Sequence, residues 1–204
     1  MELIRIRIED IDGIVDIHYE AFPNSRTTKL GKPYLRKMYS WFCENKVPLA
    51  LAIMEGDKVI GFAIGDTQPP AERLYLVCWK EITISFLKKP VLLIESGMLM
   101  RLINRCLAIM RYIFREKKPV NLGKCKEFHT AYLFSIAVKP ELQGKRIGGI
   151  LVKAFEDKAI EQGCSRVMVH TEADNIKAGR LYQKAGFILE ERIKNTNRFV
   201  KYLS

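Results

Sequence analysis

The feature that most constrains the fold is the segment at residues 133–150, Leu-Phe-Ser-Ile-Ala-Val-Lys-Pro-Glu-Leu-Gln-Gly-Lys-Arg-Ile-Gly-Gly-Ile. Its apolar first half predicts a strand that runs into Pro140, and Gly148 and Gly149 stand where a helix is expected to begin. The first N–H groups of a helix have no partner within it and lie at the positive end of its dipole. Because glycine lets the backbone approach a ligand closely, the segment predicts a pyrophosphate-binding site.

The segments before it alternate between helical and strand patterns. The expected elements are a strand at 3–8, a helix from Glu9 and Asp10 to Pro23 and Asn24, a helix at 33–43, and a hairpin of strands 48–54 and 58–65. Gly61 and Gly65 weaken the second strand of that hairpin but allow a bulge or a close approach of the backbone.

Residues at about 67–130 depart from this pattern and predict a helical insertion between two strands of the sheet. Within it, residues 97–116 form a basic amphipathic helix pattern with arginines between the apolar positions. Three interpretations stay open: a lid over the acceptor site, a helix lying on an anionic membrane surface, or a second-layer helix with its arginines in solvent.

After the glycines the chain again predicts core elements. They are a helix from Ile147 that ends near Gly163, a strand at 166–171, a helix at 176–185 stopped by Gly186, and a hairpin of 187–194 and 198–203 around Asn195-Thr196-Asn197. The expected fold class is therefore a mixed α/β sheet with helices on it.

The composition narrows the partners. The chain has 204 residues and a formal net charge of +11, which favours an anionic partner such as a phosphorylated cofactor, a nucleotide-linked substrate, nucleic acid or a membrane surface. Five widely spaced cysteines and three histidines show no metal-binding spacing, so reduced thiols, no metal and a cytoplasmic location are expected. Neither a signal peptide nor an apolar run of membrane-spanning length is expected.

A second motif lies at residues 175–187. Asn175 is a natural N-cap, which alone accounts for an asparagine there. Tyr182 lies two helical turns later on the same side of the helix. It is either a packed core tyrosine or a general acid.

Together the two motifs resemble the GNAT acetyltransferase superfamily, over about residues 131–203 closely and 1–66 in outline. There Gln/Arg-x-x-Gly-x-Gly/Ala follows the fourth strand, and Asn, Ala and Leu/Phe-Tyr follow at this spacing before Gly-Phe. The resemblance implies a single domain over 1–204 with a central sheet of about seven mostly antiparallel strands. One position departs from the pattern: Arg146 replaces its middle glycine, where an arginine can still present its backbone N–H provided that its φ is negative, and where it adds a charge.

The resemblance also implies the cofactor and its contacts. Acetyl-CoA is the expected donor, with its pantetheine arm hydrogen-bonded to the backbone of Ile136, Ala137 and Val138. The pyrophosphate site would comprise Gln143, Gly144, Lys145, Arg146, Ile147, Gly148 and Gly149. Asn175 would contact the cofactor, Tyr182 would protonate the departing thiolate, and the N–H of Val138 would stabilise the oxyanion.

The general base is open among His18, Glu20, His129 and Ser135, and deprotonation through water is equally compatible. A weaker resemblance, to members encoded among surface-polysaccharide enzymes, implies a small-molecule amine such as an amino sugar or nucleotide amino sugar. The alternatives are a protein or peptide N-acetyltransferase, or a non-catalytic module that binds CoA or an anionic surface. Nucleic acid is not expected, since no motif for it occurs, and a homodimer is one of the open oligomeric states.

Overall fold

The computed structural model describes residues 1–69, 71–90 and 129–203. The basic helix predicted at 97–116 lies outside the described residues, so its three interpretations stay predictions. The described start of the proposed insertion is helical. In the described part of the chain, no helix is long and apolar enough to cross a membrane.

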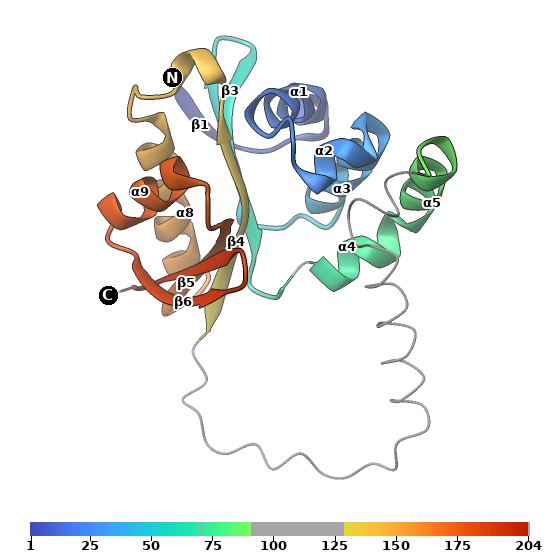
Figure 1. The fold of residues 1–204 in the computed structure, drawn as a ribbon. Helices are drawn as coiled ribbons and strands as arrows, with labels where there is room; N and C mark the ends of the chain where they lie inside the picture. Colours follow the sequence, from blue (N-terminus) through green and yellow to red (C-terminus); the bar gives the residue numbers. More distant parts are fainter. Residues whose placement is uncertain (70, 91–128, 204) are drawn as a thin grey trace.

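A seven-stranded sheet with the order β1-β2-β3-β4-β5-β7-β6 forms the centre of the molecule (Figure 1). Among the strands of the described residues, β4 and β5 alone pair in parallel, and the other neighbours are antiparallel. The predicted mixed, mostly antiparallel sheet is therefore confirmed. The strands are β1 (Glu2–Arg5), β2 (Ala50–Glu55), β3 (Lys58–Asp66), β4 (Thr130–Val138), β5 (Arg166–Glu172), β6 (Ile188–Ile193) and β7 (Thr196–Tyr202).

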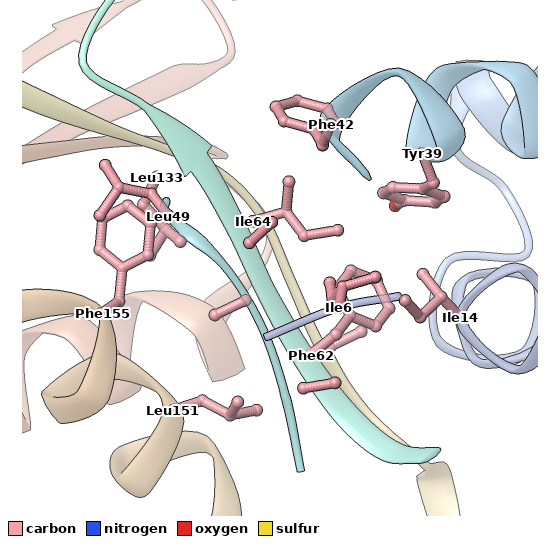
Figure 2. Packing of buried hydrophobic residues seen from close by; sticks show 14 of the residues in the cluster. Ile6, Ile14, Tyr39, Phe42, Leu49, Phe62, Ile64, Leu133, Leu151 and Phe155 are labelled. Atoms are coloured by element: carbon pink, nitrogen blue, oxygen red, sulfur yellow. The ribbon is translucent and has the colours of Figure 1, made fainter. Parts of the chain in front are cut away.

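Helices cover both faces of the sheet (Figure 1). The described helices are η1 (Ile8–Asp10), α1 (Ile11–Ala21), α2 (Arg26–Leu30), α3 (Lys32–Glu44), α4 (Ala71–Val77), α5 (Trp79–Lys88), η2 (Pro140–Leu142), α8 (Ile147–Glu161) and α9 (Ile176–Lys184). Figure 2 shows Phe155 of α8 beside Leu133 and Leu151 of α8 on the same side of β3, while Tyr39 and Phe42 of α3 lie on the other side. The core therefore has two layers separated by β3 and β4.

Two boundaries and one short helix differ from the sequence prediction. β1 ends at Arg5 rather than residue 8, because Arg7 turns back and its backbone N–H donates to Asp10 at 2.9 Å. The short helix α2 was not predicted; Ser25 caps it by accepting from the N–H of Thr28 at 3.1 Å. In the last hairpin Ile193 pairs with Thr196, so the turn lies at residues 194–195 and not at 195–197.

A bulge in β4 sets up the opening in the sheet. Ile64 pairs with Ser135 but Gly65 pairs with Leu133, which leaves Phe134 as the extra residue of β4. Gly65 is required here, because a Cβ on it would lie 2.1 Å from the carbonyl oxygen of Tyr132. The close approach and bulge expected at this glycine are confirmed.

Beyond the bulge, β4 and β5 separate. Their parallel pairing runs from Thr130↔Arg166 to Leu133↔Val169, although β4 continues to Val138 and β5 to Glu172. The second half of β4 therefore keeps β3 on one edge and leaves its other edge open to a ligand.

Candidate active site

A large cleft opens where β4 and β5 separate. Its volume is about 2150 Å³, above the roughly 300–1,000 Å³ of an ordinary small-molecule pocket. The second half of β4, the start of α8, α9, the end of β5 and the α1–α2 junction all line it. It has room for a long ligand and a second reactant together.

The open edge of β4 presents the backbone of two residues. The N–H of Lys139 donates to the carbonyl of Ile60 on β3 at 3.0 Å. Because backbone groups alternate in direction along an antiparallel strand, Ala137 also faces β3, while Ile136 and Val138 face the cleft. Of the three residues expected to hold a pantetheine arm, Ala137 is thus directed away and the other two remain.

Gln143 also acts at this edge, because its side-chain amide donates to the carbonyl of Val138 at 3.3 Å. This leaves the N–H of Val138 as the group of that residue available to a ligand.

The start of α8 exposes backbone donors to the same cleft. The N–H of Ile150 donates to the carbonyl of Arg146 at 3.2 Å, so the amides of 147–149 precede the helical ladder. A Cβ on Gly144 or Gly149 would meet no atom within 4 Å, whereas one on Gly148 would lie 3.4 Å from Leu181 of α9. Open space above unpaired amides fits a pyrophosphate, so the expected CoA group and the residues agree. Gly148 additionally lets α8 approach α9.

Two residues of the predicted pyrophosphate site have side chains that do not face the cleft. Ile147 is buried in the core at 2% exposure, and Lys145 does not line the cleft. For Ile147, only the backbone amide fits the predicted role.

Arg146 has an unexpected backbone conformation. Its φ is +66° and its ψ is 1°, so the condition of a negative φ is not met. Arg146 adopts the left-handed conformation that favours glycine, directly after Gly144 and Lys145, because the loop must reverse to enter α8. The guanidinium side chain of Arg146 lines the cleft. The residue with the strained backbone therefore also places a positive charge in the cleft.

Further basic side chains line the cleft and were not predicted, among them Lys177 and Arg180 of α9. The spacing of Lys177 and Arg180, three residues apart just after Asn175, indicates a shared helix face. That spacing could have identified them as phosphate-binding candidates. Arg146, Lys177 and Arg180 bring positive charge to this part of the cleft, whereas Lys153 of α8 is paired with Asp157 at 2.7 Å.

Asn175 and Tyr182 both line the cleft and both also have structural contacts. The side chain of Asn175 caps α9 by accepting from the N–H of Ala178 at 3.1 Å. Tyr182 is 3% exposed and packs against Phe187 and Phe199. Burial raises the pKa of Tyr182, so its hydroxyl keeps its proton at neutral pH and can donate it.

The four base candidates separate into two groups. His18 and Ser135 line the cleft. Glu20 instead lines a smaller, largely acidic hollow beside Asp16. His129 precedes β4 at the end remote from the opening, and its carbonyl accepts from the N–H of Ser165 at 2.8 Å. The geometry thus gives no support to Glu20 or His129 as bases.

His18 is buried and connected to Ser135 through α3. Its Nδ1 lies 2.6 Å from the hydroxyl of Tyr39, which lies 3.1 Å from Oγ of Ser135. Its Nε2 lies 3.0 Å from Oγ1 of Thr27. Burial lowers the pKa of His18 to about 4, so the imidazole is neutral at physiological pH.

His170 is a cleft residue that sequence reasoning missed. It follows the last β4–β5 pair, on the part of β5 that has separated from β4. Desolvation and then the charge of Arg198 lower the pKa of His170, which favours its neutral, proton-accepting form. The sequence predicts that His170 lies on a strand, but it does not indicate which part of that strand lines the cleft.

The described residues contain no group of three or more histidine, cysteine or acidic side chains that could hold a metal ion. The described cysteines Cys43, Cys78 and Cys164 are free thiols.

Comparisons with known proteins agree with this geometry. The model of the Acetyltransferase (GNAT) family matches residues 11–187. N-alpha-acetyltransferase 30 of Xenopus laevis is 34% identical over 68 residues, which are 33% of this chain and 25% of that protein. The chain thus matches about a quarter of the length of that curated relative.

Solved structures with low identity share the fold. PaiA N-acetyltransferase of Thermoplasma acidophilum, in complex with coenzyme A, superimposes with a TM-score of 0.60 at 14% identity, covering 99% of this chain and 98% of that one. The ribosomal-protein-S18-alanine N-acetyltransferase of Escherichia coli gives 0.53 at 15% identity, covering 100% and 94%. A protein of Pyrococcus horikoshii gives 0.62 at 15%, covering 100% and 98%.

Proposed function

The chain belongs to the GNAT acetyltransferase family, which uses acetyl-CoA, and we propose that it acetylates a primary amine of a small-molecule acceptor. The observation that carries this proposal is the coincidence, in one cleft, of an open strand edge and an unpaired helix N-terminus. The open strand edge suits an amide-containing arm, and the helix N-terminus suits a pyrophosphate.

Named residues would hold the cofactor. Ile136 and Val138 would bind the pantetheine arm through their backbone, and the amides of 147–149 with Arg146 would bind the pyrophosphate. Lys177 and Arg180 would contribute further positive charge. Acetyl-CoA supplies an acetyl group activated as a thioester.

Different groups of the protein would then serve different steps of acetyl transfer. The N–H of Val138 is a donor for the oxygen that gains charge during transfer. Tyr182 holds a proton that it can give to the departing sulfur. On the acceptor side, His170 is a neutral base candidate, and Ser135 offers a second polar group.

Neutral polar groups on that side support a polyhydroxylated acceptor. His18, Ser25, Thr27 and Ser135 line the cleft with hydroxyl and imidazole groups. The oxygen lone pairs of hydroxyl groups accept hydrogen bonds from sugar hydroxyls, and the net charge of +11 favours a phosphate-bearing substrate. The proposed acceptor is therefore an amino sugar, either free or nucleotide-linked.

A second candidate acceptor is the α-amine of a protein. The local similarity to N-alpha-acetyltransferase 30 favours it. Against it, a basic chain repels the basic tails that many such substrates carry. The free thiols of the described cysteines support a reducing, cytoplasmic setting for either reaction.

The test is a turnover screen with acetyl-CoA against amino sugars, nucleotide amino sugars, polyamines and peptides with free N-termini. Thiol release shows transfer, and mass spectrometry identifies the product. Acetylation of an amino sugar is the expected result, whereas turnover of peptides alone establishes the second candidate. CoA should also raise the melting temperature, and absence of that rise would refute the proposed cofactor site.

A further inference from the structure

A continuous chain of hydrogen-bonded side chains leads from the cleft into the protein on the acceptor side. It begins at Ser135 of β4, passes through Tyr39 of α3 and His18 of α1, and reaches Thr27 at 3.1, 2.6 and 3.0 Å in turn. Tyr39 is completely buried and His18 is 4% exposed. These two groups therefore depend on the chain itself for their hydrogen bonds.

The far end of the chain fixes the direction of every bond in it. Oγ1 of Thr28 lies 2.7 Å from the carbonyl oxygen of Phe22, which can only accept, so Thr28 is the donor. A hydroxyl carries one proton. Ser25 must therefore donate to Thr28 across their 2.8 Å contact, and Thr27 must donate to Ser25 across 2.9 Å.

This proton count continues through the imidazole. With the proton of Thr27 already used, Nε2 of His18 must carry a proton and donate to Thr27. His18 is neutral, since burial lowers its pKa, so its Nδ1 has no proton and accepts from the hydroxyl of Tyr39. Tyr39 then has no proton left for Ser135, so Ser135 donates to Tyr39.

The result is a serine with a defined orientation at the cleft. The hydroxyl proton of Ser135 is directed to the buried Tyr39, and Oγ of Ser135 presents its lone pairs to the cleft. We propose that the chain from Thr28 to Tyr39 holds Ser135 as a hydrogen-bond acceptor for the N–H of the acceptor amine, and so positions its nitrogen for attack.

This inference rests on the proposed function and deepens it. An amine that donates one N–H to Ser135 directs its own lone pair away from that bond. Ser135 touches the substrate, whereas Tyr39 and His18 are positioning residues that act through it. The bond also selects against groups without a polar hydrogen at the reacting atom, because Ser135 offers no proton in return.

The kinetic test uses D-glucosamine as the probe amine with acetyl-CoA. Ser135→Ala and Tyr39→Phe should each raise KM for glucosamine about tenfold, as expected for loss of one hydrogen bond, and leave KM for acetyl-CoA unchanged. The single variant His18→Gln should keep a near-native KM for glucosamine, because the glutamine amide can accept from Tyr39 and donate to Thr27. His18→Leu should not.

Tyr34→Phe is the matched control, since it removes another buried hydroxyl from the same helix outside the chain. Melting temperatures show that each variant is folded. Unchanged KM for glucosamine in Ser135→Ala and Tyr39→Phe, or an equal rise for both substrates, overturns the inference.

A second measurement does not depend on turnover. ¹⁵N NMR of His18 in the free protein should show the Nε2–H tautomer at neutral pH. The Nδ1–H tautomer reverses every bond toward Ser135 and overturns the inference, whatever the enzyme acetylates. If wild type leaves glucosamine unchanged, the proposed acceptor class fails, and the tautomer alone decides the orientation of Ser135.

Discussion

Replacing Arg146 by glycine should stabilise the protein and weaken CoA binding, two opposite effects at one position. The left-handed conformation at φ +66° costs an L-residue roughly 1–2 kcal/mol. Glycine removes that cost but gives back roughly 0.5–1 kcal/mol through its greater freedom in the unfolded chain. The net gain is about 0.5–1 kcal/mol, which for a chain of this size raises the melting temperature by about 1–4 °C.

The affinity change comes from the side chain. A hydrogen bond from a charged group contributes about 1.5–3 kcal/mol. Since the guanidinium is exposed at the cleft, the lower value applies and corresponds to about a tenfold weaker Kd for CoA. Added salt should reduce this difference, because exposed charges are screened.

Three variants separate the two effects. Arg146→Ala keeps the strain and loses the charge, Arg146→Gly loses both, and Arg146→Lys keeps both. The assay pairs thermal or urea unfolding of the free protein with calorimetric titration of CoA. We expect Arg146→Gly to be more stable than Arg146→Ala, and these two variants to bind CoA equally weakly. Arg146→Lys should match wild type in both stability and CoA affinity.

Either half of this reasoning can fail separately. A glycine variant no more stable than the alanine variant would show that residue 146 is not left-handed in solution. An alanine variant that binds CoA as wild type does would remove the guanidinium from the phosphate site.

Three further changes test other parts of the structure. Protonation of His18 favours the unfolded chain, because its pKa is about 4 when folded against 6.5. The unfolding free energy should therefore fall by about 3 kcal/mol as pH drops from 6.5 to 4, and urea titrations of His18→Gln should lack this part of the dependence. Gly65→Ala should destabilise by about 3 kcal/mol through its clash with Tyr132, whereas Gly13→Ala, at an ordinary 3.4 Å from Val59, should change the melting temperature little. Tyr182→Phe should lower kcat roughly 10²-fold with CoA affinity retained; unchanged transfer would remove Tyr182 from catalysis.

The cofactor side could be predicted from sequence because it is local. The strand before Pro140, the glycines and the helix they open are contiguous, and Asn175 and Tyr182 share one helix. Their chemistry is backbone chemistry set by helix and strand geometry. The strand edge toward which each residue's backbone N–H and C=O are directed could not be predicted from the sequence, since it depends on which neighbour the strand pairs with. Ala137 was for that reason wrongly counted among the open amides.

Arg146 shows a second limit. The residue type favours a negative φ, and from the sequence an arginine was acceptable at this position on that condition. The structure reverses it, because the loop between η2 and α8 must direct the first amides of α8 toward the cleft. Local preference is overridden here by the geometry that the site needs, as is common where strain accumulates at functional positions.

The acceptor side was not predictable for a different reason. His18, Ser135 and His170 line one cleft although they come from α1, β4 and β5, and Tyr39 of α3 is buried between His18 and Ser135. The bulge and the separation of two strands create this arrangement. Each residue alone has an ordinary structural explanation. For His18, Tyr39 and Ser135, the functional meaning lies in the direction of the hydrogen bonds that join them, which a buried neutral histidine and one backbone carbonyl determine together. If that direction positions the amine, acceptor selection in this protein depends on side chains far apart in sequence, and variants of α1 and α2 should alter KM for the amine while CoA binding is retained.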